Sequence, residues 1–293
     1  MSGADGVTLH QRLQGKRFGC VLSAGFFGFY GHAGFVDALL ASGLQPAAWA
    51  GTSAGGMVGA LAASGVPRAQ ICEAILNVSR ADFWDPDPIG IAWDMLRPGH
   101  RAGGLLKGGK FRGLLERHLR ARRFEDCPTP LLISVTNLTT QQTEVLTRGD
   151  LSSAVLATCA YPGLFAPIER DGALLWDGGI VDKAPVLALS DAGQKLDALL
   201  VHFLPSRDGA AGPKGAFAYA SGMAGGMVAS RKDHFRLQLE VLKARGIEVH
   251  VVTSQLPPVS PTTMHEGARA MEAGRQSLRS ALSAPPAGWL GSA

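Results

Sequence analysis

Cysteine is scarce in this chain, and the few cysteines present form no pattern. The 293 residues contain four of them, at positions 20, 72, 127 and 159. No Cys-x-x-Cys pair and no Cys/His cluster predicts a metal site, so we expect no metal and no other cofactor. Free thiols in a reducing cytoplasm are the default interpretation of scattered cysteines.

Long apolar runs are missing as well. No stretch reaches the roughly 18 residues that a membrane-spanning helix requires. The polar residues 1–14 contain no apolar segment of the kind found in a Sec signal peptide. We therefore expect a cytoplasmic protein that is at most peripheral to a membrane.

Charge is modest, whereas apolar content is high. Charged residues make up 18% of the chain and hydrophobic residues 46%, which favours a large core and excludes wholesale disorder. The net charge is +4, and the densest basic cluster lies within residues 117–123. This cluster fits a solvated helix face or a surface attracted to anionic lipid. No recognition motif accompanies it, so no nucleic-acid partner is expected.

Strand-like and helix-like segments alternate along the chain. Apolar runs at 18–23, 46–50 and 197–204 are typical of buried strands, and residues 32–41 and 231–244 have helical spacing. This alternation predicts an α/β fold with a mainly parallel, layered sheet.

The chain shows no internal repeat and no linker, so one catalytic domain is expected over residues 16–283. Residues 1–15 are expected to form a loose leader, and residues 284–293 a frayed tail. The segment 206–226, which is rich in glycine and alanine, is expected to be partly mobile.

The most informative motif is Gly51-Thr52-Ser53-Ala54-Gly55, which fits the G-x-S-x-G pattern of a nucleophile elbow. An apolar run precedes it and small, helix-compatible residues follow it. Gly51 and Gly55 would leave room for a strained strand-to-helix turn that exposes the serine hydroxyl. The same residues also fit a glycine-rich turn that only packs a helix on a sheet.

Four further segments follow a known pattern when they are taken in order with this motif. They are the glycine- and phenylalanine-rich residues 22–28, the P-G-L-F-A-P run within 160–167, the D-G-G run at 177–179, and residues 181–186. Together they resemble the patatin-like phospholipases over about residues 16–190. The resemblance implies a three-layer α/β/α fold with a mainly parallel central sheet. It also implies a serine acyl hydrolase that cleaves lipid acyl esters as a phospholipase A or lysophospholipase does.

The resemblance further implies a catalytic dyad with Ser53 as the nucleophile and Asp177 as the general base. The two residues are 177 − 53 = 124 positions apart, so only the fold can bring them together. From the residues alone, Asp177 follows a short strand-like run, a common place for chemistry in α/β sheets, but it also fits a turn-capping aspartate. A dry pocket would raise its pKa above the ordinary value of about 3.9.

An oxyanion formed at Ser53 would need N–H donors that are already in place. The candidates are the backbone amides of Gly25, Phe26, Phe27 and Gly28, with that of Ala54 in addition. The family loop has the form G-G-G-x-[K/R]-G, and Gly28 stands where its basic residue belongs. Three outcomes stay open: amides alone suffice, another cation substitutes, or catalysis is weakened.

Aromatic side chains supply the candidates for an acyl pocket. They are Phe26, Phe27 and Phe29 of the glycine-rich loop, with Trp84 and Trp93 of the segment 82–109. This segment is a candidate lid or membrane-facing insertion, because indole rings tolerate a lipid interface. Ordinary core packing is the alternative for all of these aromatics.

The favoured hypothesis is therefore a Ser–Asp acyl hydrolase that works through an acyl-enzyme, acts on lipid or phospholipid, and touches membranes transiently. One alternative is an α/β-hydrolase esterase, in which one of four late histidines completes a Ser-Asp-His triad. These histidines are His202, His234, His250 and His265. Another is a lipid-binding protein whose catalysis is weakened by the missing basic residue. No motif bears on the oligomeric state.

Overall fold

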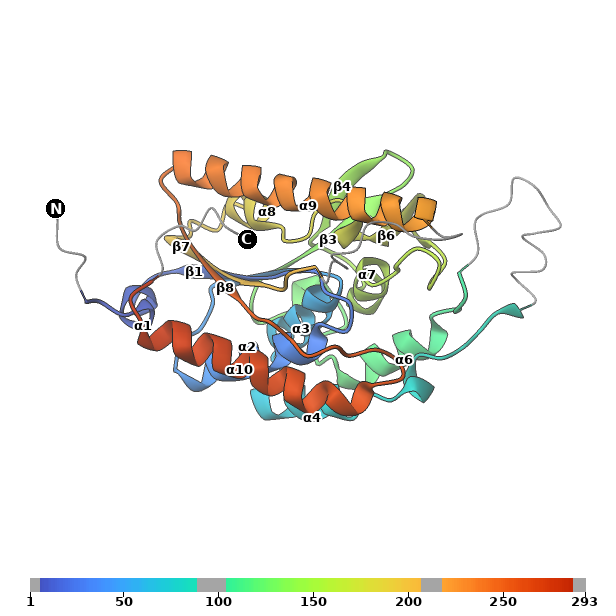
Figure 1. Ribbon diagram of the computed structural model, residues 1–293, viewed down its shortest axis with the longest axis horizontal. Helices are drawn as coiled ribbons and strands as arrows, with labels where there is room; N and C mark the ends of the chain where they lie inside the picture. Colours follow the sequence, from blue (N-terminus) through green and yellow to red (C-terminus); the bar gives the residue numbers. More distant parts are fainter. Residues whose placement is uncertain (1–5, 89–103, 207–217, 287–293) are drawn as a thin grey trace.

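A sheet of eight strands forms the middle layer of the protein (Figure 1). The computed structural model describes residues 6–88, 104–206 and 218–286. Five strands run parallel in the order β3-β2-β1-β7-β8, and β4, β5 and β6 join antiparallel at the β3 end. The strands are β1 (Phe18–Leu22), β2 (Ala48–Thr52), β3 (Leu131–Asn137), β4 (Gln142–Leu146), β5 (Ile168–Arg170), β6 (Ala173–Asp177), β7 (Ala198–Phe203) and β8 (Glu248–Thr253).

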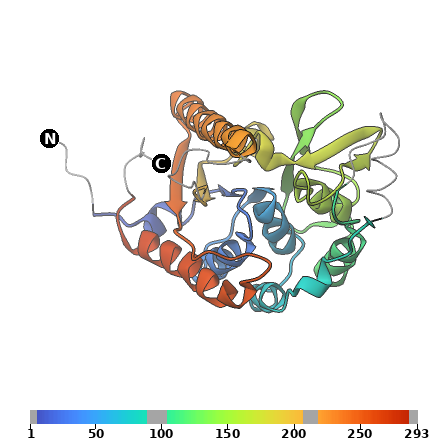
Figure 2. The ribbon, with the colours of Figure 1, turned by 45° about the vertical axis from the view of Figure 1, so that its right-hand side comes forward.

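Helices cover both faces of the sheet, which confirms the predicted three-layer α/β/α arrangement with a mainly parallel sheet (Figures 1 and 2). One face carries α8 (Val186–Asp191) and α9 (Ala218–Ala244). The other carries α1 (Leu9–Leu13), α2 (Phe29–Ala41), α3 (Ala54–Ala63), α4 (Arg68–Leu76), α6 (Gly109–His118), α7 (Leu151–Thr158) and α10 (Gly267–Ser283). Short 3-10 helices are η1 (Arg80–Asp82), η2 (Phe124–Asp126), η3 (Gly178–Ile180) and η4 (Met264–Glu266).

Two hydrophobic clusters, one on each face, explain why the central strands are apolar without interruption. In β1, Phe18, Cys20 and Leu22 pack toward α2 and α3, whereas Val21 packs toward α8 and α9. Every residue of β1 is buried, as expected for a parallel strand covered on both sides. None of the helices in the described ranges has the length and hydropathy that a membrane span requires.

Two segments that the sequence predicts to be irregular contain helices. Residues 9–13 of the expected loose leader form α1, with Leu9 and Leu13 buried and the Leu9 amide donating to the Ala284 carbonyl at 2.8 Å. Thr8 closes its first turn with a capping box. Residues 218–226 of the expected mobile segment form the start of α9.

The segment 82–109 is described only at its two ends, and residues 89–103, including Trp93, lie outside the described residues. The two ends are tied to each other: Asp85 accepts hydrogen bonds from the amides of Gly108 and Lys110 at 3.1 and 3.0 Å. Leu106 is buried and donates its amide to the Leu164 carbonyl at 2.9 Å.

Helices α2 and α10 meet at glycines, which let their backbones come very close. A Cβ atom placed on Gly34 would lie 1.8 Å from the Met271 carbonyl oxygen, and one on Gly274 would lie 2.0 Å from the Gly31 carbonyl oxygen. Backbone atoms cannot give way as a flexible side chain can, so only glycine fits at these two positions.

We expect Gly34→Ala to lower the free energy of unfolding by about 2 kcal/mol or more, because the new methyl group forces α2 and α10 apart. Gly226→Ala is the matched control, since this helical glycine of α9 has open space around its Cα. Alanine there should raise the free energy of unfolding by roughly 0.5–1 kcal/mol. Urea unfolding monitored by circular dichroism measures both, and equal values for the two variants would contradict the close contact.

Candidate active site

The candidate site arises because two strands, β2 and β6, share one side of β3. Strand β4 pairs with Ile133–Asn137 of β3 and occupies its other side throughout. On the shared side, β2 runs parallel to β3 and ends with Thr52 opposite Ser134. Strand β6 runs the opposite way and ends with Asp177 opposite Val135. The two strands therefore end head to head at adjacent positions of β3.

This arrangement brings Ser53 and Asp177 into contact. The Ser53 Oγ donates to the Asp177 Oδ2 at 2.7 Å. The other carboxylate oxygen, Oδ1, accepts from the Gly179 amide, also at 2.7 Å. The Asp177 side chain is only 4% exposed, whereas Ser53 is partly accessible. The pair has the geometry of a hydroxyl nucleophile held by a carboxylate base.

The turn at Ser53 has a strained backbone that its neighbours accommodate. Ser53 has φ 54° and ψ −123°, a conformation that non-glycine residues rarely adopt. A Cβ on Gly55 would lie 2.2 Å from the Leu22 carbonyl oxygen, and one on Gly51 would lie 2.5 Å from the Gly55 carbonyl oxygen. The two motif glycines are thus required by close backbone approach, and α3 begins directly after the serine.

Thr158 holds this turn in place, and sequence reasoning missed it. Its Oγ1 accepts from the Ser53 amide at 2.8 Å and donates to the Ser134 carbonyl oxygen at 2.6 Å. The hydroxyl therefore joins the elbow to β3 through two hydrogen bonds inside the core. A threonine at the end of a helix carries no local motif, so no signal in the sequence identifies this role.

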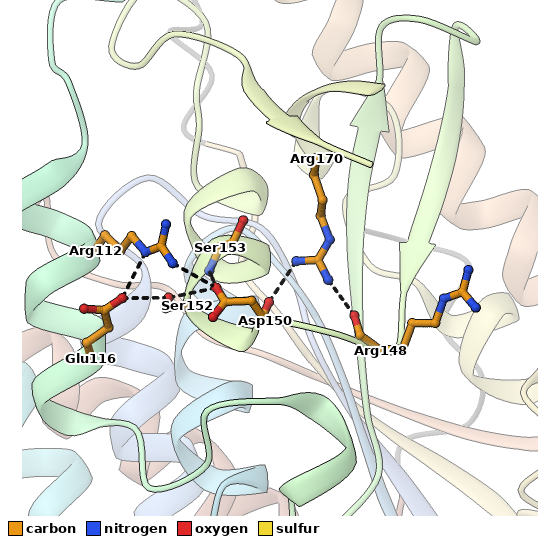
Figure 3. A network of polar contacts seen from close by, with 7 residues as sticks. All are labelled: Arg112, Glu116, Arg148, Asp150, Ser152, Ser153 and Arg170. Atoms are coloured by element: carbon orange, nitrogen blue, oxygen red, sulfur yellow. Dashed lines mark hydrogen bonds and ion pairs between the residues drawn. The ribbon is translucent and has the colours of Figure 1, made fainter. Parts of the chain in front are cut away.

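Thr158 is the last residue of α7, and a polar network holds the first turn of that helix (Figure 3). Asp150 caps the helix by accepting from the Ser153 amide at 2.7 Å, and its carbonyl accepts from Arg170 of β5 at 2.8 Å. Arg112 of α6 reaches the same carboxylate at 3.4 Å. These charged groups are partly exposed, so the network orients α7 more than it stabilises the fold.

Burial determines the acidity of Asp177. Desolvation raises the pKa of its carboxyl group to about 6, against the opposing effects of the hydrogen bonds from Ser53 and Gly179 and the positive charge of Arg231. Asp177 is therefore ionised at neutral pH, yet it is a stronger base than an exposed aspartate. The nearby Cys159 thiol stays neutral, because burial and the Asp177 charge raise its pKa.

A cavity of about 770 Å³ opens at the serine and the aspartate. All the candidate acyl-pocket residues that the structure describes line it: Phe26, Phe27, Phe29 and Trp84. The Phe27 ring contacts the Phe26 and Phe29 rings, with centroids 5.0 and 5.4 Å apart, and Phe26 is 62% exposed. An apolar cavity beside a serine hydroxyl suits a ligand with a hydrocarbon chain.

The candidate oxyanion donors also lie along this cavity, but one of them has another partner. The Gly28 amide donates to the Gly25 carbonyl oxygen at 2.8 Å and closes a tight turn. Phe27 takes φ 53° within this turn. The amides of Gly25, Phe26, Phe27 and Ala54 donate to no acceptor among the residues that the structure describes.

Leu204 occupies the space that a side chain at position 28 would need. A Cβ on Gly28 would lie 2.4 Å from the Leu204 Cδ1 and 3.0 Å from the Gly25 carbonyl oxygen. An arginine or lysine there would require Leu204 to move. The cations that line the cavity come instead from Lys183 and from Arg231 of α9.

None of the four late histidines lines the cavity formed by the described residues, and each lies within 4.0 Å of another polar side chain. His202 Nε2 lies 2.8 Å from Ser254 Oγ, and its Nδ1 lies 2.8 Å from His32 Nδ1. His250 pairs with Glu248 at 3.0 Å, His234 lies 4.0 Å from Asp182, and His265 lies 3.8 Å from Glu266.

The buried pair of His32 and His202 has one consistent pattern of protons. Burial lowers the pKa of both rings, that of His32 to about 3, so both are neutral. His32 Nε2 lies 2.8 Å from the Ser23 carbonyl oxygen and must donate to it. Its Nδ1 then accepts from His202 Nδ1, and His202 Nε2 accepts from Ser254. The pair thus joins the ends of β1, α2, β7 and β8 behind the cavity.

Metal-binding side chains do not gather in the part of the chain that the structure describes. No group of three or more His, Cys, Asp or Glu residues there could hold an ion. The polar groups of the site are a hydroxyl, a carboxylate, backbone amides and two cations.

Comparison with known proteins gives a consistent result. Residues 20–190, more than half of the chain, match the family model described as patatin-like phospholipase. An uncharacterized NTE family protein of Mycobacterium tuberculosis is 28% identical over 181 residues, which cover 61% of this chain and 47% of that protein. The lysophospholipase NTE1 of Mycosarcoma maydis is 29% identical over 199 residues, 66% of this chain and 10% of that protein. The chain thus matches about half, or less, of these relatives' length.

Among solved structures, VipD from Legionella pneumophila aligns with a TM-score of 0.50 at 16% sequence identity. The alignment covers 91% of this chain and 67% of that chain. At this identity, the similarity extends to the fold alone.

We expect Thr158→Val to destabilise the protein by about 1–3 kcal/mol, because the Ser53 amide and the Ser134 carbonyl lose a partner inside the core. Thr140→Val, in an exposed turn, is the control and should change stability by less than about 0.5 kcal/mol. Thermal unfolding measures both. A Thr158→Val variant as stable as the wild type would show that the Thr158 hydroxyl does not hold the elbow.

Proposed function

Because the chain belongs to the patatin-like phospholipase family, we propose that it is a serine acyl hydrolase that cleaves acyl esters of lipids by phospholipase A or lysophospholipase chemistry. The observation that carries the proposal is the 2.7 Å hydrogen bond from Ser53 Oγ to Asp177 Oδ2 at an apolar cavity. One relative is named a lysophospholipase, which supports glycerophospholipids as the substrate class.

In the first half of the proposed reaction, Ser53 Oγ attacks the ester carbonyl carbon as its proton passes to Asp177 Oδ2. The carbonyl oxygen becomes an oxyanion. When the intermediate collapses, the C–O bond to the alcohol breaks and Asp177 returns the proton to the leaving oxygen. The acyl group stays on Ser53 as an ester.

In the second half, water attacks the acyl-enzyme and gives one proton to Asp177. Collapse of this second intermediate breaks the bond to Ser53 Oγ, which takes the proton back, and the fatty acid leaves. The Gly179 amide holds the carboxylate through both halves by donating to its Oδ1. A fixed carboxylate needs no reorientation between its roles as base and acid.

The amides of Gly25, Phe26, Phe27 and Ala54, which meet no acceptor among the described residues, are the proposed donors to the oxyanion. Ala54 is the first residue of α3, and α2 begins at Phe29, so the positive ends of both helix dipoles lie near the serine. In a water-poor cavity, donors of this kind each stabilise the transition state by about 3 kcal/mol.

The contacts of the histidines argue against the alternative of a Ser-Asp-His triad. Asp177 already accepts the Ser53 hydroxyl, and none of the four late histidines is among the described residues that line the cavity. The side chains at the cavity therefore support a Ser–Asp dyad rather than a triad. The alternative of a lipid-binding protein instead predicts lipid binding with little or no ester hydrolysis.

We expect Ser53→Ala and Asp177→Asn each to lower hydrolysis of a fatty-acyl ester by at least about 10³-fold, since each removes a partner in proton transfer. Asp171→Asn, whose side chain is 91% exposed, is the control and should keep wild-type turnover. A fluorophosphonate probe should label the wild type and not Ser53→Ala. A wild type that binds liposomes but neither turns over ester nor takes up the probe would favour the lipid-binding protein.

We expect kcat/KM to rise with pH through an acid limb centred near pH 6 and then to level off. The base must be ionised, and burial raises the pKa of Asp177 to about 6, so protonation removes activity below that pH. Cys159 also lies near it, but burial and the Asp177 charge raise the pKa of this thiol, so it stays neutral in this range. Initial rates on a soluble neutral ester from about pH 3.5 to 8.5 test this. An acid limb near pH 4 would contradict a desolvated base.

A further inference from the structure

The charged side chains that line the cavity include groups that the proposed reaction does not require. Two cations, Lys183 and Arg231, line it, and Asp177 is the only carboxylate among the described residues that do so. In an environment of low dielectric, positive charge that faces a cavity favours an anionic ligand.

Arg231 holds its guanidinium group beside the dyad. Its Nη1 donates to the Gly179 carbonyl oxygen at 2.7 Å, and its Nε donates to the Met227 carbonyl oxygen at 3.2 Å. Both acceptors are neutral. A guanidinium group carries five N–H donors, and the other three meet no acceptor among the residues that the structure describes. The two bonds fix the plane of a group that binds phosphate oxygens well.

Lys183 adds a second cation that is built into the protein rather than displayed on its surface. The residue is only 5% exposed, and its Nζ donates to Ser206 Oγ at 2.8 Å. The Lys183 carbonyl accepts from the Ala24 amide at 2.7 Å, which ties this residue to the start of the glycine-rich loop. Burying an ammonium group is costly, so its place along the cavity is a specific feature of the site.

Arg231 and two of the aromatic residues that line the cavity come from elements on opposite faces of the sheet. Arg231 belongs to α9, above the sheet in Figures 1 and 2. Phe111 belongs to α6, below the sheet in both views, and Trp84 follows η1, which packs against α6. An amphiphile with an apolar chain and an anionic group close to its ester matches this division.

We propose that Arg231, with Lys183 adding positive charge, binds the phosphate of a substrate whose acyl ester lies at Ser53, so that the enzyme prefers phosphate-bearing acyl esters to neutral glycerides. This subsite rests on the proposed hydrolase function and specifies its substrate. Arg231 of α9 and Lys183, which follows η3, would supply the positive charge that position 28 lacks.

The test compares two esters with the same short acyl chain, 1-octanoyl-glycerol-3-phosphate and 1-octanoylglycerol. Both are used as monomers, so that attraction of the enzyme to a charged lipid surface plays no part. The rates are measured at pH 8, above the pKa of about 6 of Asp177. The readout is the ratio of kcat/KM for the phosphate ester to kcat/KM for the neutral ester.

We expect Arg231→Gln to lower this ratio about ten-fold, mainly through KM for the phosphate ester, because a charge-assisted hydrogen bond is lost. Arg231→Lys should restore part of it. Arg236→Gln is the matched control: it removes the same charge from the same helix, but Arg236 is 65% exposed and should leave the ratio unchanged. Inorganic phosphate should inhibit hydrolysis of the neutral ester weakly in the wild type and not in Arg231→Gln.

A wild type without preference for the phosphate ester would overturn the subsite. So would an Arg231→Gln variant that slows both esters equally, because Arg231 would then act only by holding Gly179. Inhibition by inorganic phosphate without preference for the phosphate ester would assign the site to free anion instead of a headgroup. Loss of neutral-ester hydrolysis in Ser53→Ala tests the hydrolase function separately, and absence of turnover on both esters would remove both proposals.

Discussion

The candidate site depends on how the neighbouring strands share the two edges of β3. With β4 along one edge of β3, the other edge is left for both β2 and β6, which approach from opposite directions and stop at adjacent positions. Neither strand can be lengthened without running into the other. The hydroxyl and the carboxylate are therefore brought together by backbone pairing, before any side-chain contact is considered.

Ser134 lies at the junction and shows how tightly the backbone packs there. Its carbonyl oxygen accepts from Thr158, and it would lie 2.2 Å from a Cβ placed on Gly178. One peptide unit of β3 thus supports the elbow through Thr158 and requires the first glycine after Asp177. The D-G-G run is a packing requirement of β3 as much as a feature of the chemistry.

The chemistry of the cavity follows from what surrounds this junction. Burial makes Asp177 a stronger base than an aspartate in water, and Arg231 limits how far its pKa rises. The same guanidinium holds the Gly179 carbonyl while the Gly179 amide holds the carboxylate. A single turn of three residues therefore connects the base to α9.

Local patterns in the sequence predict those parts of the fold that depend on residues close together in the chain. The apolar run before Ser53 and the glycines at 51 and 55 indicate the strand, turn and helix that the structure has. The start of α9 was not predicted, because glycines at 222, 225 and 226 lower helix propensity. The roles of Thr158, Leu204 and Arg231 depend on contacts between distant segments, for which no local pattern exists.

The glycine contact between α2 and α10 has a consequence for synthesis on the ribosome. The first of these helices emerges early, and the helix that covers it is among the last parts of the described chain to be made. The close backbone contacts of Gly34 with Met271 and of Gly31 with Gly274 can therefore form only after most of the described chain has left the ribosome.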